Sequence, residues 1–171
     1  MLFRSACMAE IARLTGAEED AARYARNADG ARKAYDALFV QTGQLETNRQ
    51  AKIVRPLALG LLEGEDVKRA QAHLVRAVED YHCRVGTGFL STPFILPELI
   101  RAGRADIAYK VLENTGKPGW LAEVKEGATT IWESWEGNAS RNHYSPGAVC
   151  EWLFDTVGGI RVDGENHFTI R

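Results

Sequence analysis

The feature of this sequence that most restricts its fold is a series of helical apolar stripes separated by short turns. Four apolar residues recur at steps of four, four and three, which places them on one helix face: Phe3, Cys7, Ile11 and Leu14. The Thr15-Gly16 turn ends that segment, and a second stripe runs from Tyr24 to Leu38. Two helices joined by so short a turn are expected to pack antiparallel as a hairpin.

The same pattern continues along the chain. A wide apolar stripe over residues 53–62 predicts a buried helix, and residues 67–81 predict the next one. Residues 93–102 and 105–115 predict a shorter hairpin, and 146–157 predict one last helix. The tail Arg161–Arg171 alternates like a strand. We therefore expect an all-α fold made of antiparallel helical hairpins in series, with a β-strand at the C-terminus.

Composition excludes several classes of protein. The length of 171 residues suits one domain, and 21 Lys and Arg against 23 Asp and Glu give a net charge of −2. That balance provides no basic surface to displace counterions from phosphates, so we expect no nucleic-acid partner. No apolar run approaches the roughly 20 residues of a membrane span, so we expect no membrane association.

We expect neither a cofactor nor a metal ion. The loop containing Gly86 and Gly88 lacks the third glycine of a dinucleotide fingerprint, because Ser91 occupies that position. The phosphate-loop sequence Gly-Lys-Ser/Thr does not occur. The three cysteines, Cys7, Cys83 and Cys150, are far apart and form no Cys-x-x-Cys pair.

The region with the clearest chemical character is GATTIWESWE at 127–136, where Trp132 and Trp135 flank Glu133. An aromatic ring offers an apolar face to the C–H groups of a sugar, and a carboxylate accepts hydroxyl protons or activates water. Asn142-His143-Tyr144 adds polar groups just downstream. The alternative is that both tryptophans are core residues and Glu133 is a surface charge.

Three strings in this chain resemble the bacterial α-L-rhamnosidase family: TGFLSTP at 87–93, GATTIWESW at 127–135 and NHYSPGAVCEWLF at 142–154. LTGAEEDAARY at 14–24 is also similar to the helical hairpins of that family. The resemblance implies a six-hairpin (α/α)6-barrel glycosidase domain. Residues 1–160 would form its C-terminal half, and 161–171 would begin a truncated C-terminal β-sandwich.

The resemblance also implies a reaction. Family members release terminal α-L-rhamnose from glycosides with inversion, which needs an acid and a base. Glu133 matches the base that activates water, Trp132 and Trp135 would wall the sugar pocket, and His143 would bind sugar hydroxyls. Thr87 and Phe89 match another motif near the site. The family's general acid has no counterpart in this sequence.

Three expectations follow from the resemblance to half of a barrel. The isolated chain should lack hydrolytic activity, and its exposed helix faces should make it marginally stable or self-associating. No signal-peptide pattern is present, so the default location is cytoplasmic, but the N-terminus resembles an interior point of the family's domain and leaves the location open.

Two alternative functions remain. The first is another (α/α)6-barrel sugar-processing enzyme, such as a glucuronyl hydrolase or a trehalase-like protein. The second is a helical interaction module without catalysis.

Overall fold

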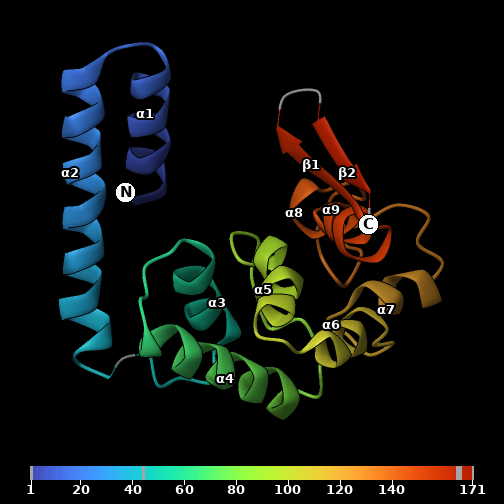
Figure 1. Ribbon diagram of the computed structural model, residues 1–171. Coiled ribbons are helices and arrows are strands. Elements are labelled where there is room, and N and C mark those ends of the chain that lie inside the picture. The colour runs from blue at the N-terminus through green and yellow to red at the C-terminus, as the bar shows by residue number, and fades with distance from the viewer. Residues whose placement is uncertain (1, 44, 165–166, 171) are drawn as a thin grey trace.

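The computed structural model describes residues 2–43, 45–164 and 167–170, and its described part is built mainly of paired helices. The pairs are α1 (Leu2–Leu14) with α2 (Glu18–Tyr35), α3 (Gln50–Ala58) with α4 (Glu65–Asp80), and α5 (Ile95–Arg101) with α6 (Ala105–Leu112). Three short helices follow: α7 (Trp120–Lys125), α8 (Tyr144–Gly147) and α9 (Val149–Trp152). The predicted hairpins are confirmed, and the fold is all-α with a small sheet at its end (Figure 1).

The turns between paired helices follow from the sequence. Gly16 and Gly103 have φ values of 74° and 73°, a left-handed conformation that glycine adopts without steric cost and that commonly ends a helix. α2 and α9 each continue into one π-helical turn, over Asp36–Val40 and Leu153–Val157. The second turn completes the helix predicted over 146–157.

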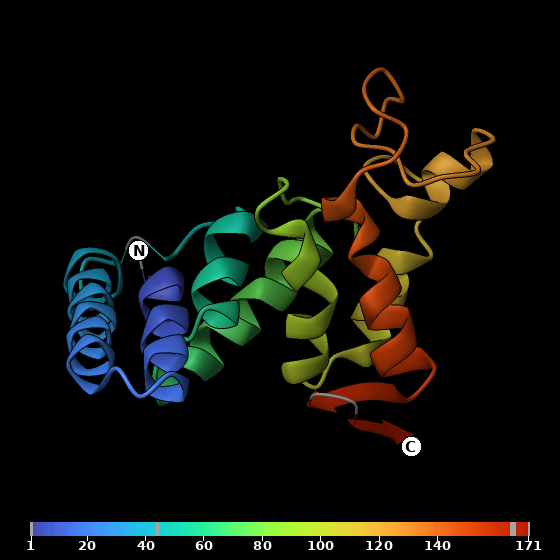
Figure 2. The same ribbon diagram turned by 90° about the horizontal axis from the view of Figure 1, so that it is seen from above.

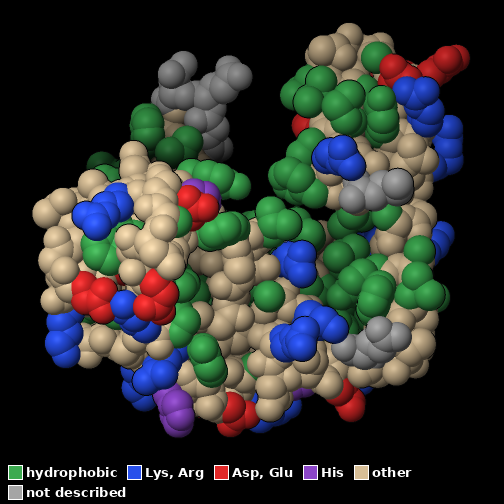
Figure 3. Space-filling view, turned by 180° about the vertical axis from the view of Figure 1, so that it is seen from behind, with side chains coloured by type: hydrophobic (Ala, Val, Ile, Leu, Met, Phe, Trp, Pro, Cys, Tyr) green, Lys and Arg blue, Asp and Glu red, His purple; other side chains and the backbone are tan. Residues whose placement is uncertain are grey.

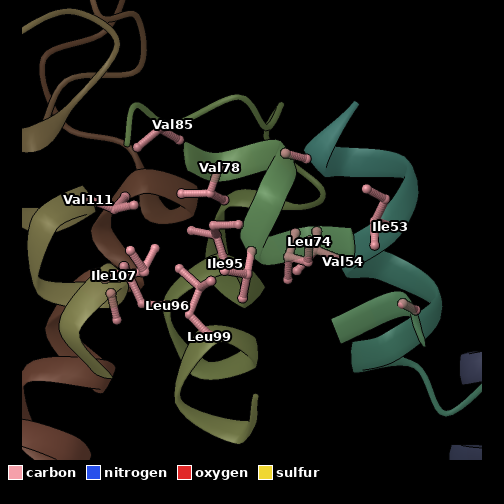
Figure 4. Packing of buried hydrophobic residues seen from close by; sticks show 14 of the residues in the cluster. Ile53, Val54, Leu74, Val78, Val85, Ile95, Leu96, Leu99, Ile107 and Val111 are labelled. Atoms are coloured by element: carbon pink, nitrogen blue, oxygen red, sulfur yellow. The ribbon is translucent and has the colours of Figure 1, made fainter. Parts of the chain in front are cut away.

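The buried core lies in the middle of the chain. Isoleucine, leucine and valine side chains from α3, α4, α5 and α6 meet there, as Figure 4 shows for Ile53, Leu74, Ile95, Leu99 and Ile107. Each of these side chains is at most 1% exposed. Full burial of such a side chain contributes about 1.5–3 kcal/mol, so this cluster holds the middle hairpins together.

The α1–α2 hairpin differs from the prediction in which face it covers. Phe3, Ile11 and Leu14 are 62%, 52% and 73% exposed, whereas Ser5 and Ala12 are the buried residues of α1. Small side chains let two helices approach closely, so the large apolar stripe of α1 is left facing away from α2. Figure 3 shows hydrophobic side chains gathered on the surface of the α1–α2 hairpin.

Two parts of the structure differ from the sequence prediction: α7 was not predicted, and the C-terminal tail was predicted as one strand. α7 lies in a segment rich in glycine and tryptophan and has only six residues, too few for a periodic signal. The C-terminal tail forms two antiparallel strands, β1 (Ile160–Gly164) and β2 (His167–Ile170), with Ile160 paired to Ile170. Its assignment to a β-sandwich stays a prediction. Figure 2 shows this hairpin at one end of the helices and the loops after α7 at the other.

Candidate active site

Two segments of the chain form the site. The first, residues 84–92, follows α4 and is held by the side chain of Gln50, which is only 1% exposed. The Gln50 amide nitrogen donates to the carbonyl of Arg84 (3.0 Å), and its oxygen accepts from the Gly86 N–H (2.8 Å). A Cβ at Gly86 would lie 2.8 Å from Gln50 Cδ, so glycine permits this close approach. The bond pair fixes the backbone directly before Thr87.

Hydroxyl groups shape the rest of this first segment. The Thr87 and Thr92 hydroxyls lie 2.9 Å apart, and the Thr92 hydroxyl also donates to the carbonyl of Gly88 (3.2 Å). The buried Ser145 hydroxyl, from α8, donates to the carbonyl of Phe89. These contacts tie the segment 87–92 to the start of the helix that follows the second segment.

The second segment is the loop 127–143, which is held by backbone hydrogen bonds across itself. The N–H of Glu133 donates to the carbonyl of Ser140 (2.8 Å), and the N–H of His143 donates to that of Ile131 (3.0 Å). The Thr130 hydroxyl donates to the carbonyl of Arg141. Such cross-loop bonds satisfy backbone groups that no regular element satisfies here.

The two segments, together with Pro146 of α8, line an open pocket of about 330 Å³. Its lining residues are Thr87, Gly88, Phe89, Thr92, Glu133, Ser134, Trp135, Glu136, Ala139 and Pro146. Ligand pockets run from roughly 300 to 1,000 Å³, so this one suits a small ligand. A larger hollow of about 650 Å³ lies between α1 and α2, but its walls are alanine-rich and carry charged side chains that pair with one another.

Four of the six predicted site residues line this one pocket: Thr87, Phe89, Glu133 and Trp135. Glu133 is half-buried, and its Oε2 accepts from the N–H of Ser140 (3.3 Å). Trp135 packs edge-on against Trp120 with ring centroids 5.8 Å apart. The Trp120 indole in turn donates to the carbonyl of Pro146 (2.9 Å), so the wall formed by Trp135 rests on a buried support.

The other two predicted site residues stand outside the lining. Trp132 is 8% exposed, its ring lies close to Gly137, and the Arg141 guanidinium lies 5.4 Å from the ring centroid. His143 packs against the Phe89 ring, with centroids 4.8 Å apart. Its Nδ1 accepts from the N–H of Ser145 (3.2 Å), and in a neutral imidazole this leaves Nε2 as the donor.

Sequence reasoning missed the residues that support the loop. Glu123 of α7 is 2% exposed, and its Oε2 accepts from the N–H of Trp132 (3.2 Å). Burial raises the pKa of the Glu123 carboxyl, while the Trp132 N–H opposes that shift. Lys117 Nζ pairs with Glu126 (2.7 Å) and with Glu136 (3.1 Å), and its hydrogen bonds to these two carboxylates raise the pKa of Lys117.

Neither a metal centre nor a membrane-spanning helix is found in the described residues. No three histidine, cysteine, aspartate or glutamate side chains in this part of the chain converge on a point where a metal ion would bind. None of its helices combines the length and the apolar character needed to cross a bilayer.

Comparisons with known proteins identify the family. Residues 2–157 match the model of the bacterial alpha-L-rhamnosidase 6 hairpin glycosidase domain. An alpha-L-rhamnosidase of Formosa agariphila is 32% identical over 165 residues, covering 89% of this chain and 18% of the relative. A similar relative from Streptomyces avermitilis is 32% identical over 154 residues, covering 83% of this chain and 15% of that protein. The chain therefore spans less than a fifth of the length of these relatives.

Solved structures agree with this match. The crystal structure of the Aspergillus terreus alpha-L-rhamnosidase superposes with a TM-score of 0.90 at 27% identity, covering 99% of this chain and 21% of that one. The Streptomyces avermitilis alpha-L-rhamnosidase complexed with L-rhamnose gives a TM-score of 0.85 at 31% identity, covering 95% and 17%. The chain belongs to the bacterial α-L-rhamnosidase six-hairpin glycosidase family.

Proposed function

We propose that the pocket binds a terminal α-L-rhamnosyl group and that Glu133 activates the water that hydrolyses its glycosidic bond. The observation that carries the proposal is the placement of Glu133 in one small pocket with Trp135 and Phe89. An indole and a phenyl ring provide apolar faces for a sugar, and a carboxylate is the base that such a reaction needs. Family membership supports glycoside hydrolysis, and a relative's structure contains L-rhamnose.

Each residue has a role in this proposal. The Ser140 N–H holds Glu133 Oε2, so we assign Oε1 to the attacking water. Thr87, Phe89 and Trp135 form the sugar-facing wall, and His143 supports this wall by packing against the Phe89 ring from outside the lining. Trp132 supports the wall from its buried position.

The reaction proposed is an inverting displacement. It needs a second carboxyl group, an acid that protonates the leaving oxygen, roughly 6.5–9.5 Å from the base. The other carboxylate in the pocket lining is Glu136, which is engaged in an ion pair with Lys117. We therefore assign the acid to a residue outside these 171, and we expect the isolated chain to bind L-rhamnose without hydrolysing glycosides.

Tryptophan fluorescence tests sugar binding by the chain. L-rhamnose should produce a saturable change, D-glucose should not, and Trp135→Phe should reduce the response because Trp135 lines the pocket. A folded chain with no response to L-rhamnose would refute binding by these residues alone. Equal responses to both sugars would refute the assignment to rhamnose.

Kinetics of an active enzyme containing these residues test the role of Glu133. Glu133→Ala should lower kcat by about 10²–10⁴-fold, the usual contribution of a general base. Added azide should restore turnover, because it is a nucleophile that needs no base. NMR of the first sugar product should show an inverted anomeric centre; a retained centre would refute the inverting mechanism.

A further inference from the structure

Glu123 is a buried carboxyl group next to the candidate base. It lies on α7, between the buried residues Trp120 and Ala122 on one side and the start of the loop 127–143 on the other. Its side chain is 2% exposed, yet among the described residues it has no ion-pair partner, and it does not line the pocket. A glutamate in such a place needs an explanation, since burying a carboxylate is unfavourable unless it is well paired.

Glu123 accepts two hydrogen bonds from the loop, and the one to its side chain explains why the residue is a glutamate. Its backbone carbonyl accepts from the N–H of Ala128 (3.0 Å), and its side-chain Oε2 accepts from the N–H of Trp132 (3.2 Å). The two donors, Ala128 and Trp132, are the first and last residues of the stretch 128–132. Glu123 therefore holds this stretch at two points, and the second point is the peptide between Ile131 and Trp132, one residue before Glu133.

The next bond in the loop belongs to Glu133 itself. Its N–H donates to the carbonyl of Ser140 (2.8 Å), so consecutive N–H groups, of Trp132 and of Glu133, are held by α7 and by the far side of the loop. These two amides belong to the peptides on either side of the Trp132 Cα, so fixing both fixes the backbone that carries the chain into Glu133. Without Glu123 Oε2, the first of these amides has no acceptor in the described contacts.

The second oxygen of Glu123 distinguishes a positioning role from simple packing. Oε1 is buried and has no hydrogen-bond partner among the described residues. An apolar side chain of similar size would fill the same space without leaving a buried oxygen unsatisfied. The carboxyl group therefore adds to this site the acceptor for Trp132 rather than a favourable core contact.

We propose that Glu123 is a positioning residue, which orients the base Glu133 by accepting the N–H of Trp132. This inference rests on the proposed function, because it assumes that the direction of Glu133 matters for a bound sugar. It predicts that an acceptor at position 123 is needed and that its charge is not. Glutamine keeps the acceptor, whereas leucine removes it and keeps the volume.

The test compares Glu123→Gln, Glu123→Leu and a control, Glu113→Gln, which makes the same carboxylate-to-amide change at the exposed C-terminal end of α6. Exchange of the Trp132 amide is followed by NMR, and L-rhamnose affinity by fluorescence titration. Glu123→Leu should speed Trp132 exchange at least tenfold and weaken L-rhamnose binding about five- to tenfold. Glu123→Gln and Glu113→Gln should stay within twofold of the unchanged chain.

Any other outcome refutes either the positioning role of Glu123 or the proposed function. A Trp132 amide that exchanges freely in the unchanged chain overturns the inference even if Glu123→Leu fails to fold. Equal loss of binding in the Gln and Leu variants also overturns it, because charge would then matter rather than the acceptor. If the unchanged chain does not bind L-rhamnose but Trp132 exchange responds as expected, the proposed function fails and the backbone role of Glu123 stands. Binding of L-rhamnose unaffected by Glu123→Leu refutes the positioning role alone.

Discussion

Trp132 and Trp135 stand three residues apart in one motif, and the structure predicts that replacing the first with alanine mainly lowers stability and replacing the second mainly lowers sugar affinity. Trp132 is 8% exposed, packs close to Gly137 and carries Arg141 over its ring. Removing a buried tryptophan side chain costs about 3–5 kcal/mol, and the lost cation–π contact lies within that range. For a chain of this size the melting temperature should fall by roughly 6–20 °C.

Trp135 is half-buried and lines the pocket, with one edge contact to Trp120. Trp135→Ala should therefore cost only about 1–2 kcal/mol of stability. Its larger effect should be on L-rhamnose affinity. The pair of variants serves as its own control, because the same side chain is removed from the same loop.

Urea unfolding followed by far-UV circular dichroism measures the stability of both variants without depending on tryptophan emission. Calorimetric titration with L-rhamnose measures their affinity. Equal urea midpoints for the two variants would refute the difference in burial. Loss of sugar binding in Trp132→Ala at unchanged stability would place that ring in the sugar wall, as the motif alone suggested, and would refute the supporting role assigned to it.

Three other changes have expected outcomes. Gln50→Leu removes the two hydrogen bonds to the backbone of Arg84 and Gly86, so it should lower the free energy of unfolding by about 2–4 kcal/mol in a urea titration. An unchanged urea midpoint would show that these two bonds do not stabilise the fold. Burial raises the pKa of Glu98, so the folded chain binds this proton more tightly than the unfolded chain does, and the contribution of Glu98 to stability should fall as the pH rises from about 4.5. Glu98→Gln should remove this contribution from the pH dependence of unfolding, and an identical pH dependence in both chains would contradict it. Replacing the exposed Ile11 and Leu14 with glutamine should reduce concentration-dependent association in sedimentation velocity; a monomeric parent chain with a concentration-independent melting transition would contradict the expected self-association.

The hairpins could be predicted from the sequence because helical periodicity is a local signal. It places Tyr24 and Tyr35 on one face of α2, and it places Gly103 between α5 and α6. The orientation of a stripe is different, because it depends on which neighbour covers it. Phe3 and Leu14 form the predicted stripe on α1, but the close contact with α2 leaves both of them exposed.

The candidate site was partly predictable for a related reason. The strings containing Thr87 and Glu133 identify the two segments, and the fold brings both into one pocket. The spacing of Trp132 and Trp135 does not predict that the first is buried and the second lines the pocket, because the loop that contains them has no regular period. Gly137, with a φ of 69°, turns the chain back over the Trp132 ring, and a Cβ there would lie 2.6 Å from it.

The supporting residues were not predictable from residue type. Gln50 and Glu123 are polar residues on helices, and such residues usually lie at the surface. Here each is almost fully buried and faces a loop whose backbone N–H groups have no regular ladder. Only the tertiary arrangement shows that Gly86 and Trp132 donate to them.

Burial of these two polar groups implies that stability and sugar binding respond separately to mutation. An apolar core residue contributes through the area that it removes from water, whereas a buried carboxyl group contributes only through the partners that it finds. Glu123 leaves one oxygen unsatisfied, so leucine at this position removes that penalty while it also removes the acceptor for Trp132. Removing the unsatisfied oxygen should stabilise the fold, and removing the acceptor should destabilise it. Only the loss of the acceptor should change the position of Glu133. A Glu123→Leu chain that melts no lower than its parent and still binds L-rhamnose more weakly would separate the geometry of the pocket from the stability of the fold.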